Sequence, residues 1–287
     1  PNEYDDVYVG SLVFNSSNQV EFMPTNDLPI REFPLKDNKA KGAIEIFKMP
    51  EKGNDGKVFQ NRYILSFDPI DFDASNTMSL ASIFVLDLWT DKIVAEYTGR
   101  QDYADDNYEI LRRLCMFYNG KCLYENNLKG TFAYFSRMNC LYLLADTPEY
   151  LKDKDLIKSV GYGNLSKGVT ATKVINDYAN TLIRNWFLLP KPTITEIEGE
   201  QIETEIYNLY FIRNRALLKE SILYNPDINV DRIRSLGLLM LYREQYMVTY
   251  NGDLQGSKKV TPKDYLGNDP FFTKNYNLKF NKPVNLI

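Results

Sequence analysis

The chain has 287 residues, of which 44% are hydrophobic and 25% charged, and this balance excludes a generally disordered protein. The formal net charge of −4 excludes a diffuse basic surface that holds nucleic acid by charge alone, so any polyanion site must be local. The sequence contains no histidine, which removes hydrolase mechanisms that depend on imidazole and zinc sites with histidine ligands.

The cysteines and the distribution of apolar residues predict where the protein resides. Cys115, Cys122 and Cys140 lie in apolar segments without CxxC spacing, which predicts core thiols in a reducing compartment. The sequence has no secretory leader and no run of about 18 apolar residues, so we expect neither secretion nor membrane contact. The chain begins Pro1-Asn2 rather than with methionine, and we expect it to be a portion of a longer protein.

The first part of the chain, residues 1–60, contains short extended stretches separated by Asn, Asp, Gly and Pro. This pattern predicts an N-terminal arm or a small extension of a sheet. From residue 61 onward the pattern changes to strands joined by short turns, at 62–67, 82–88 and 92–97. Consecutive strands of this kind predict an antiparallel three-strand meander.

Helices with apolar residues at three-and-four spacing follow the meander, at 105–118, 129–138, 172–188 and 230–246. Further strands are predicted at 121–124 and 141–145. A mixed sheet with helical cover, of the α/β class, is therefore expected over residues 61–250. Loops are predicted in three places: the glycine-rich segment 160–168, the acidic segment 196–205 and the C-terminal extension 251–287.

Three carboxylates stand where predicted elements end or begin. Asp68 ends the first strand of the meander before Pro69, Glu125 follows the strand 121–124, and Asp231 opens the last helix. Hard divalent cations prefer carboxylate oxygens, and two Mg2+ or Mn2+ ions about 3.5–4 Å apart can drive phosphodiester hydrolysis.

We therefore assign Asp68 as the ligand that bridges two ions and Glu125 and Asp231 as the ligands that complete each shell. Asp71, Asp73 and Asp227 are reserve ligands; Asp73 is included in the candidate metal site, and which of the three is the auxiliary ligand stays open. Each acid also has a simpler explanation, as a turn residue, a loop start or a first-turn acid that favours the helix dipole.

Four stretches carry a resemblance to a known family: 61–69, 91–100, 122–127 and 229–237. Their order and spacing resemble the nuclease half of the large terminase subunit of tailed bacteriophages, a member of the RNase H-like superfamily. The resemblance implies an RNase H-like mixed sheet, metal binding by Asp68, Glu125 and Asp231, and cleavage of concatemeric viral DNA during genome packaging.

The resemblance also implies partners and a location. Double-stranded DNA, a portal protein and a small terminase subunit are expected in the host cell cytoplasm. No GxxxxGK[ST] phosphate loop occurs, so an ATPase half is expected outside this chain. A hairpin and basic residues near the metals would correspond to 160–168, Lys167 and Lys173, although solvated surface lysines are an equally good interpretation. Arg232 and Arg234 could contact phosphates or pair with neighbours such as Asp227.

These inferences predict a two-metal DNA endonuclease with little sequence preference, whose products carry 3′-hydroxyl and 5′-phosphate ends. Two alternatives remain open. Another RNase H-like nuclease, such as a Holliday-junction resolvase, would select branched DNA. A non-catalytic binding module of a packaging motor would keep the acids for structure alone and would not respond to divalent ions.

Overall fold

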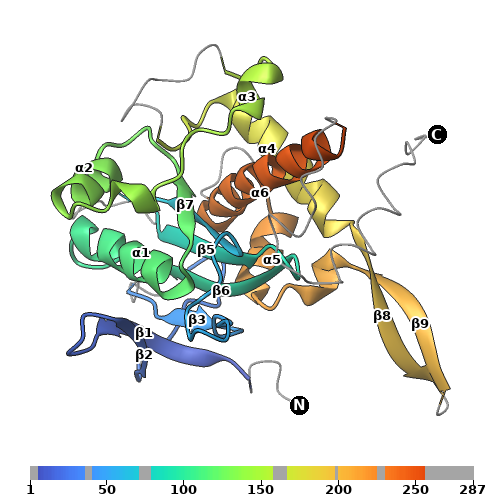
Figure 1. Ribbon diagram of the computed structural model, residues 1–287, viewed down its shortest axis with the longest axis horizontal. Helices are drawn as coiled ribbons and strands as arrows, with labels where there is room; N and C mark the ends of the chain where they lie inside the picture. The colour runs from blue at the N-terminus through green and yellow to red at the C-terminus, as the bar shows by residue number, and fades with distance from the viewer. Residues whose placement is uncertain are drawn as a thin grey trace.

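A mixed sheet, in the order β2-β1-β3-β6-β5-β4-β7, forms the centre of the computed structural model (Figure 1). The structure describes residues 6–35, 41–70, 79–157, 167–197, 200–224 and 230–255. In the described sheet β4 and β7 pair in parallel and all other pairs are antiparallel. The strands are β1 (Tyr8–Phe14), β2 (Val20–Pro24), β3 (Ile44–Ile46), β4 (Tyr63–Asp68), β5 (Ala81–Asp87), β6 (Lys92–Gly99) and β7 (Lys121–Tyr124).

Helices cover both faces of the sheet, each over its own apolar core (Figure 1). One core lies beneath α1 (Ala104–Tyr118) and α2 (Gly130–Arg137). The other lies beneath α4 (Lys173–Phe187), α5 (Arg215–Ile222) and α6 (Asp231–Gln255). The short helices η1 (Leu141–Leu143), α3 (Tyr150–Asp153) and η3 (Asn208–Phe211) join these elements. The predicted fold class is confirmed: an α/β mixed sheet with an antiparallel meander, consistent with an RNase H-like fold.

The alternation of side chains along β4 decides which residues meet α6. Tyr63, Leu65 and Phe67 belong to the core beneath α1, whereas Ile64 belongs to the core beneath α6. Successive strand residues point to opposite faces, so Ser66 and Asp68 share the α6 face with Ile64. The hydroxyl of Ser66 lies 3.0 Å from that of Ser235, which fixes α6 across β4.

The described part of residues 1–60 is continuous with this sheet. β3 pairs with β6, and β1 and β2 continue outward from β3 to the sheet edge. The N-terminal part is thus a sheet extension in the structure. In the described part of the chain no helix is both long and apolar enough to cross a membrane.

Three predicted elements differ from the structure. The segment 141–145 forms η1 and one bridge, Cys122 with Leu144, instead of a strand, because the amide of Leu143 bonds back to the carbonyl of Cys140. The acidic segment 196–205 belongs to the hairpin of β8 (Pro190–Ile197) and β9 (Glu200–Tyr207), which extends away from the sheet in Figure 1. The last helix continues to Gln255, into the predicted C-terminal loop region. Residues 158–166, the centre of the predicted glycine-rich loop, and 256–287 lie outside the described residues.

Candidate functional site

Asp68 and Glu125 lie side by side at the end of the sheet where the neighbouring strands β4 and β7 terminate. Phe67 of β4 is in register with Tyr124 of the parallel strand β7, and the amide of Glu125 donates to the carbonyl of Phe67 at 3.2 Å. Neighbouring strands lie about 4.8 Å apart, and residues in register on parallel strands point to the same face. The two carboxylates therefore both start from the α6 face of this edge.

Asp231 reaches the same edge from α6. It is the first residue of the helix, which packs across β4 and β5. Its Oδ2 accepts a hydrogen bond of 2.7 Å from the amide of Leu80, immediately before β5. This bond ties the start of the helix to the strand whose Ser82 is paired with Asp68. The structure thus brings together the three acids that the sequence singles out.

The three acids influence one another electrostatically. Burial raises the pKa of Asp68 well above its usual range, and the charges of Asp231 and Glu125 raise it further. Burial also raises the pKa of Glu125. The guanidinium of Arg234, one turn beyond Asp231, opposes both shifts. The site therefore places the buried Asp68 near two partly exposed acids, and a bound cation would relieve the cost of that charge.

A metal ion fits the donor set, although the side chains do not yet enclose one. Within the ranges that the structure describes, no group of three or more Asp, Glu, Cys or His side chains forms a ready metal shell. Carboxylate oxygens are the ligands that Mg2+ and Mn2+ prefer, and Asp68 is 7% exposed. Ion binding at this edge would require rotation of the carboxylates toward a common point. The auxiliary candidates Asp71, Asp73 and Asp227 lie outside the described residues.

A groove of about 350 Å³ between α4 and α6 adjoins these acids, because Glu125 is part of its lining. Lys173, the first residue of α4, lines it from one helix, and Arg234 lines it from the other. Both side chains are exposed. Two exposed cations therefore line the same groove as Glu125.

The other two basic candidates serve the fold instead. Arg232 is 2% exposed, pairs with Glu220 at 3.4 Å and donates to the carbonyl of Ile30 at 2.6 Å. The predicted DNA contact by Arg232 is corrected, since a buried guanidinium cannot reach a phosphate. Lys167 donates to the carbonyl of Leu144 at 3.0 Å and pairs with Asp146 at 2.9 Å, so its ammonium is directed to its own loop.

Helix phase separates the two arginines. Residues three apart on a helix share a face, which places Arg234 beside Asp231, whereas Arg232 is rotated by about 100°.

The sequence analysis did not identify Glu220, which supports this helix start. Its Oε1 accepts from the amide of Ile233 at 3.0 Å, and no local sequence pattern announces this contact between α5 and α6.

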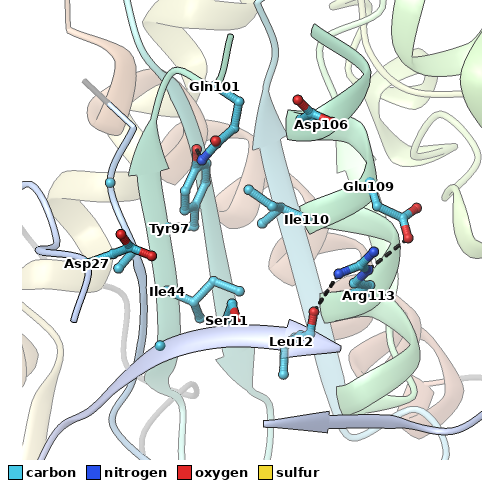
Figure 2. Close-up of a pocket in the computed structure, with 13 residues that line it drawn as sticks. Ser11, Leu12, Asp27, Ile44, Tyr97, Gln101, Asp106, Glu109, Ile110 and Arg113 are labelled. Atoms are coloured by element: carbon cyan, nitrogen blue, oxygen red, sulfur yellow. Dashed lines mark hydrogen bonds and ion pairs between the residues drawn. The ribbon is translucent and has the colours of Figure 1, made fainter. Parts of the chain in front are cut away.

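A second hollow lies on the opposite face of the sheet, between β1, β6 and α1 (Figure 2). Arg113 of its lining pairs with Glu109 at 2.8 Å and donates to the backbone carbonyl of Leu12 at 2.7 Å. The hydroxyl of Tyr97 donates to Asn107 at 3.1 Å. These contacts join the sheet to α1, so the groove beside Glu125 is the better candidate for substrate.

Comparisons with known proteins include a distant structural likeness. No protein-family model matches the chain, and no curated protein matches it. Among solved structures, the large terminase nuclease from thermophilic phage G20c aligns with 74% of this chain and 91% of that chain. The likeness is remote. The TM-score is 0.29 and the sequence identity is 12%, so this is a distant structural resemblance to a nuclease and the site must be argued from the chain's own residues.

Proposed function

We propose that this chain is a metal-dependent nuclease that hydrolyses phosphodiester bonds of double-stranded DNA. Asp68, Glu125 and Asp231 would hold two Mg2+ or Mn2+ ions. The observation that supports the proposal is the convergence of these acids, one of them buried, at the edge where β4 and β7 end. Acids serving only turns and helix starts would gain nothing from meeting in a buried place, where their repulsion costs stability.

The chain's own residues have distinct tasks in this mechanism. When bound, the ions supply a water of lowered pKa and positive charge for the leaving oxygen. Asp68 and Glu125 hold them from the sheet, and the amide of Leu80 fixes one oxygen of Asp231, which orients the other. Lys173 and Arg234 bind phosphates of the strand and position the bond to be cut. The expected products carry 3′-hydroxyl and 5′-phosphate ends.

The biological setting belongs to the same proposal. The four stretches that resemble the terminase nuclease support a role in cutting viral concatemers during packaging. A portal protein, a small terminase subunit and an ATPase half of the same polypeptide would then be the partners.

Divalent ions test the function directly. With Mn2+ or Mg2+ the protein should nick and linearise plasmid, and a chelator should stop the reaction. Asp231→Asn should lower the rate at least about 100-fold, because loss of a group behind the ligands already costs about 10–100-fold. Asp106→Asn is the matched control, since Asp106 is also an acid in the first turn of a helix but lies on α1. An inert wild type whose melting temperature ignores Mn2+ would favour the binding-module alternative.

Salt tests the two cations of the groove. Each phosphate contact contributes about 0.9 to the slope of log affinity against log salt for duplex DNA. Lys173→Ala and Arg234→Ala should each reduce this slope by about one, measured by binding of a labelled duplex without metal. Lys121→Ala is the control, because Lys121 is an exposed lysine at the opposite end of β7. If the slope is unchanged in both groove variants, neither Lys173 nor Arg234 contacts DNA phosphates.

A further inference from the structure

The groove between α4 and α6 combines an apolar floor with a polar rim. Its floor consists of buried side chains from both helices and from the residue just before α6: Ile175, Ala179, Val230, Ile233, Leu238 and Leu241. Its rim carries charged and amide groups: Glu125, Lys173, Asn176, Asp177, Asn180 and Arg234. Phosphate alone would use only the cations, whereas the apolar floor and the amides would suit a ligand that also has an apolar face.

The groove is built into the packing of the two helices. They touch where Gly237 faces Ala179, and a Cβ at Gly237 would lie 3.1 Å from the Cβ of Ala179. The loop beside Glu125 is held to the start of α4, because the side-chain oxygen of Asn127 accepts from the amide of Ala171 at 2.8 Å. The distance between the candidate acids and the groove is therefore fixed by backbone contacts.

The rim offers groups that suit a nucleobase. Asn176 and Asn180 are one helical turn apart, so their amides line the same face of α4 and can both donate and accept. Asn180 donates to the hydroxyl of Tyr224 at 2.9 Å, and the ring of Tyr224 is 40% exposed. Base edges and faces are hidden in a paired, stacked duplex and become available when a nucleotide is unpaired.

From these contacts we infer that the α4–α6 groove holds one unpaired nucleotide of the strand being cut. Its phosphates lie against Lys173 and Arg234, and its sugar and base lie over the apolar floor. The inference rests on the proposed nuclease function and names its substrate: DNA whose strands are separated next to the bond that is hydrolysed.

Matched substrates test the inference. An intact duplex and the same duplex with a short unpaired bubble are compared at equal Mn2+ concentration. The wild type should cut the bubble about tenfold faster than the duplex, which is within the range that one stacked base contributes. Asn180→Phe fills the groove and should bring the ratio of the two rates close to one. Thr181→Phe adds the same ring to an exposed neighbouring position that does not line the groove, and should keep the ratio.

A binding measurement separates this inference from the nuclease proposal. A short labelled single strand is titrated without added metal, with fluorescence anisotropy as the readout. Asn180→Phe should weaken binding about tenfold, whereas Thr181→Phe should match the wild type. Equal binding by all three proteins, or equal cutting of bubble and duplex by the wild type, overturns the inference. Failure to cut any DNA while the binding difference persists overturns the nuclease proposal and leaves the groove assignment standing.

Discussion

Asp68→Asn should abolish cleavage and at the same time raise the melting temperature of the metal-free protein. Asp68 is 7% exposed, and Asp231 and Glu125 add like charge to the cost of its burial. An amide of the same shape removes the buried charge and the repulsion but cannot bridge cations. Opposite effects on activity and stability are expected of a residue kept for function at the expense of the fold.

Both effects can be given a size. The rate of Mn2+-dependent nicking should fall at least about 1000-fold, since even groups that only orient metal ligands cost about 10–100-fold when lost. The melting temperature in a chelator should rise by about 2–4 °C, the shift that about 1 kcal/mol produces in a domain of this size. Adding Mn2+ should raise the melting temperature of the wild type far more than that of the variant.

The stability gain should depend on pH with a definite sign. The pKa of Asp68 is raised above its usual 3.8, so the folded protein binds the proton more tightly than the unfolded chain. Stability contributed by this group is therefore complete below pH 3.8 and is lost as the pH rises through the raised value. The gap in melting temperature between the variant and the wild type should open above pH 3.8 and be widest at neutral pH.

A matched control distinguishes this behaviour from that of any buried aspartate. Asp87 ends β5 with no exposed surface and accepts from the guanidinium of Arg62 at 3.0 and 2.8 Å. Asp87→Asn should lower the melting temperature and leave the cleavage rate per folded molecule unchanged. If Asp68→Asn instead lowers the melting temperature and keeps activity, Asp68 is a structural residue and the metal assignment fails.

The places of Asp68 and Glu125 at strand ends could be predicted from local features, whereas the parallel pairing of β4 with β7 that joins them is a long-range contact. Each acid directly follows a short apolar run, and acids at the carboxyl ends of neighbouring parallel strands necessarily meet. Asp231 was predictable as a helix start. Its position next to the ends of β4 and β7 was not predictable, because it follows from long-range packing of α6. The contact of Ser66 with Ser235 is an example that no local pattern encodes.

The roles of Arg232 and Arg234 could not be separated in the same way. A helix at the surface has one apolar face, which fixes the phase of every other residue. α6 is buried over most of its first three turns, so apolar residues surround it and indicate no single face. Only its packing between the sheet, α4 and α5 shows that Arg232 is directed inward and Arg234 toward the groove.

The hairpin of β8 and β9 was missed because its charge concealed its periodicity. The segment around it alternates Thr or Ile with Glu, which is the period of a strand with one polar face. The density of glutamates instead favours a solvated loop. Acidic side chains are compatible with an exposed two-stranded ribbon, since only its backbone bonds are needed to form the ladder.

Asp91→Asn should cause the largest loss of stability without loss of the reaction. Asp91 accepts from the guanidinium of Arg243 at 2.6 and 2.9 Å and from the indole of Trp186 at 3.1 Å, and Lys191 lies 3.7 Å away. These contacts join the β5–β6 turn to α4, β8 and α6. Removing one partner of a buried ion pair typically costs about 3–5 kcal/mol, because the other charge loses its compensation without regaining water.

Asparagine can replace Asp91 without backbone strain, and the effect of the substitution on stability should depend on pH. Asp91 has a φ of 54°, a left-handed conformation that asparagine adopts readily. Burial alone would raise the pKa of Asp91, but Arg243 and Lys191 outweigh it and hold the pKa below 3.8. The stability from this carboxylate is thus present above pH 3.8 and is lost as the pH falls through the lowered value. The difference between wild type and variant should shrink in that acidic range.

Thermal melts at neutral pH should show a fall on the order of 10 °C for Asp91→Asn, from about 2–4 °C per kcal/mol. Asp155→Asn is the control, because Asp155 has the same left-handed backbone but an exposed side chain. Adding Arg243→Met to Asp91→Asn should restore part of the loss, since the buried charge is then removed as well. β5 runs antiparallel to β4, so the turn that carries Asp91 and the end of β4 that carries Asp68 lie at opposite ends of these strands. Cleavage well below the melting point should therefore persist. An Asp91→Asn variant that melts like the wild type would contradict the stabilising role of Asp91. A variant that is folded but inactive would contradict the expectation that Asp91 takes no part in the reaction.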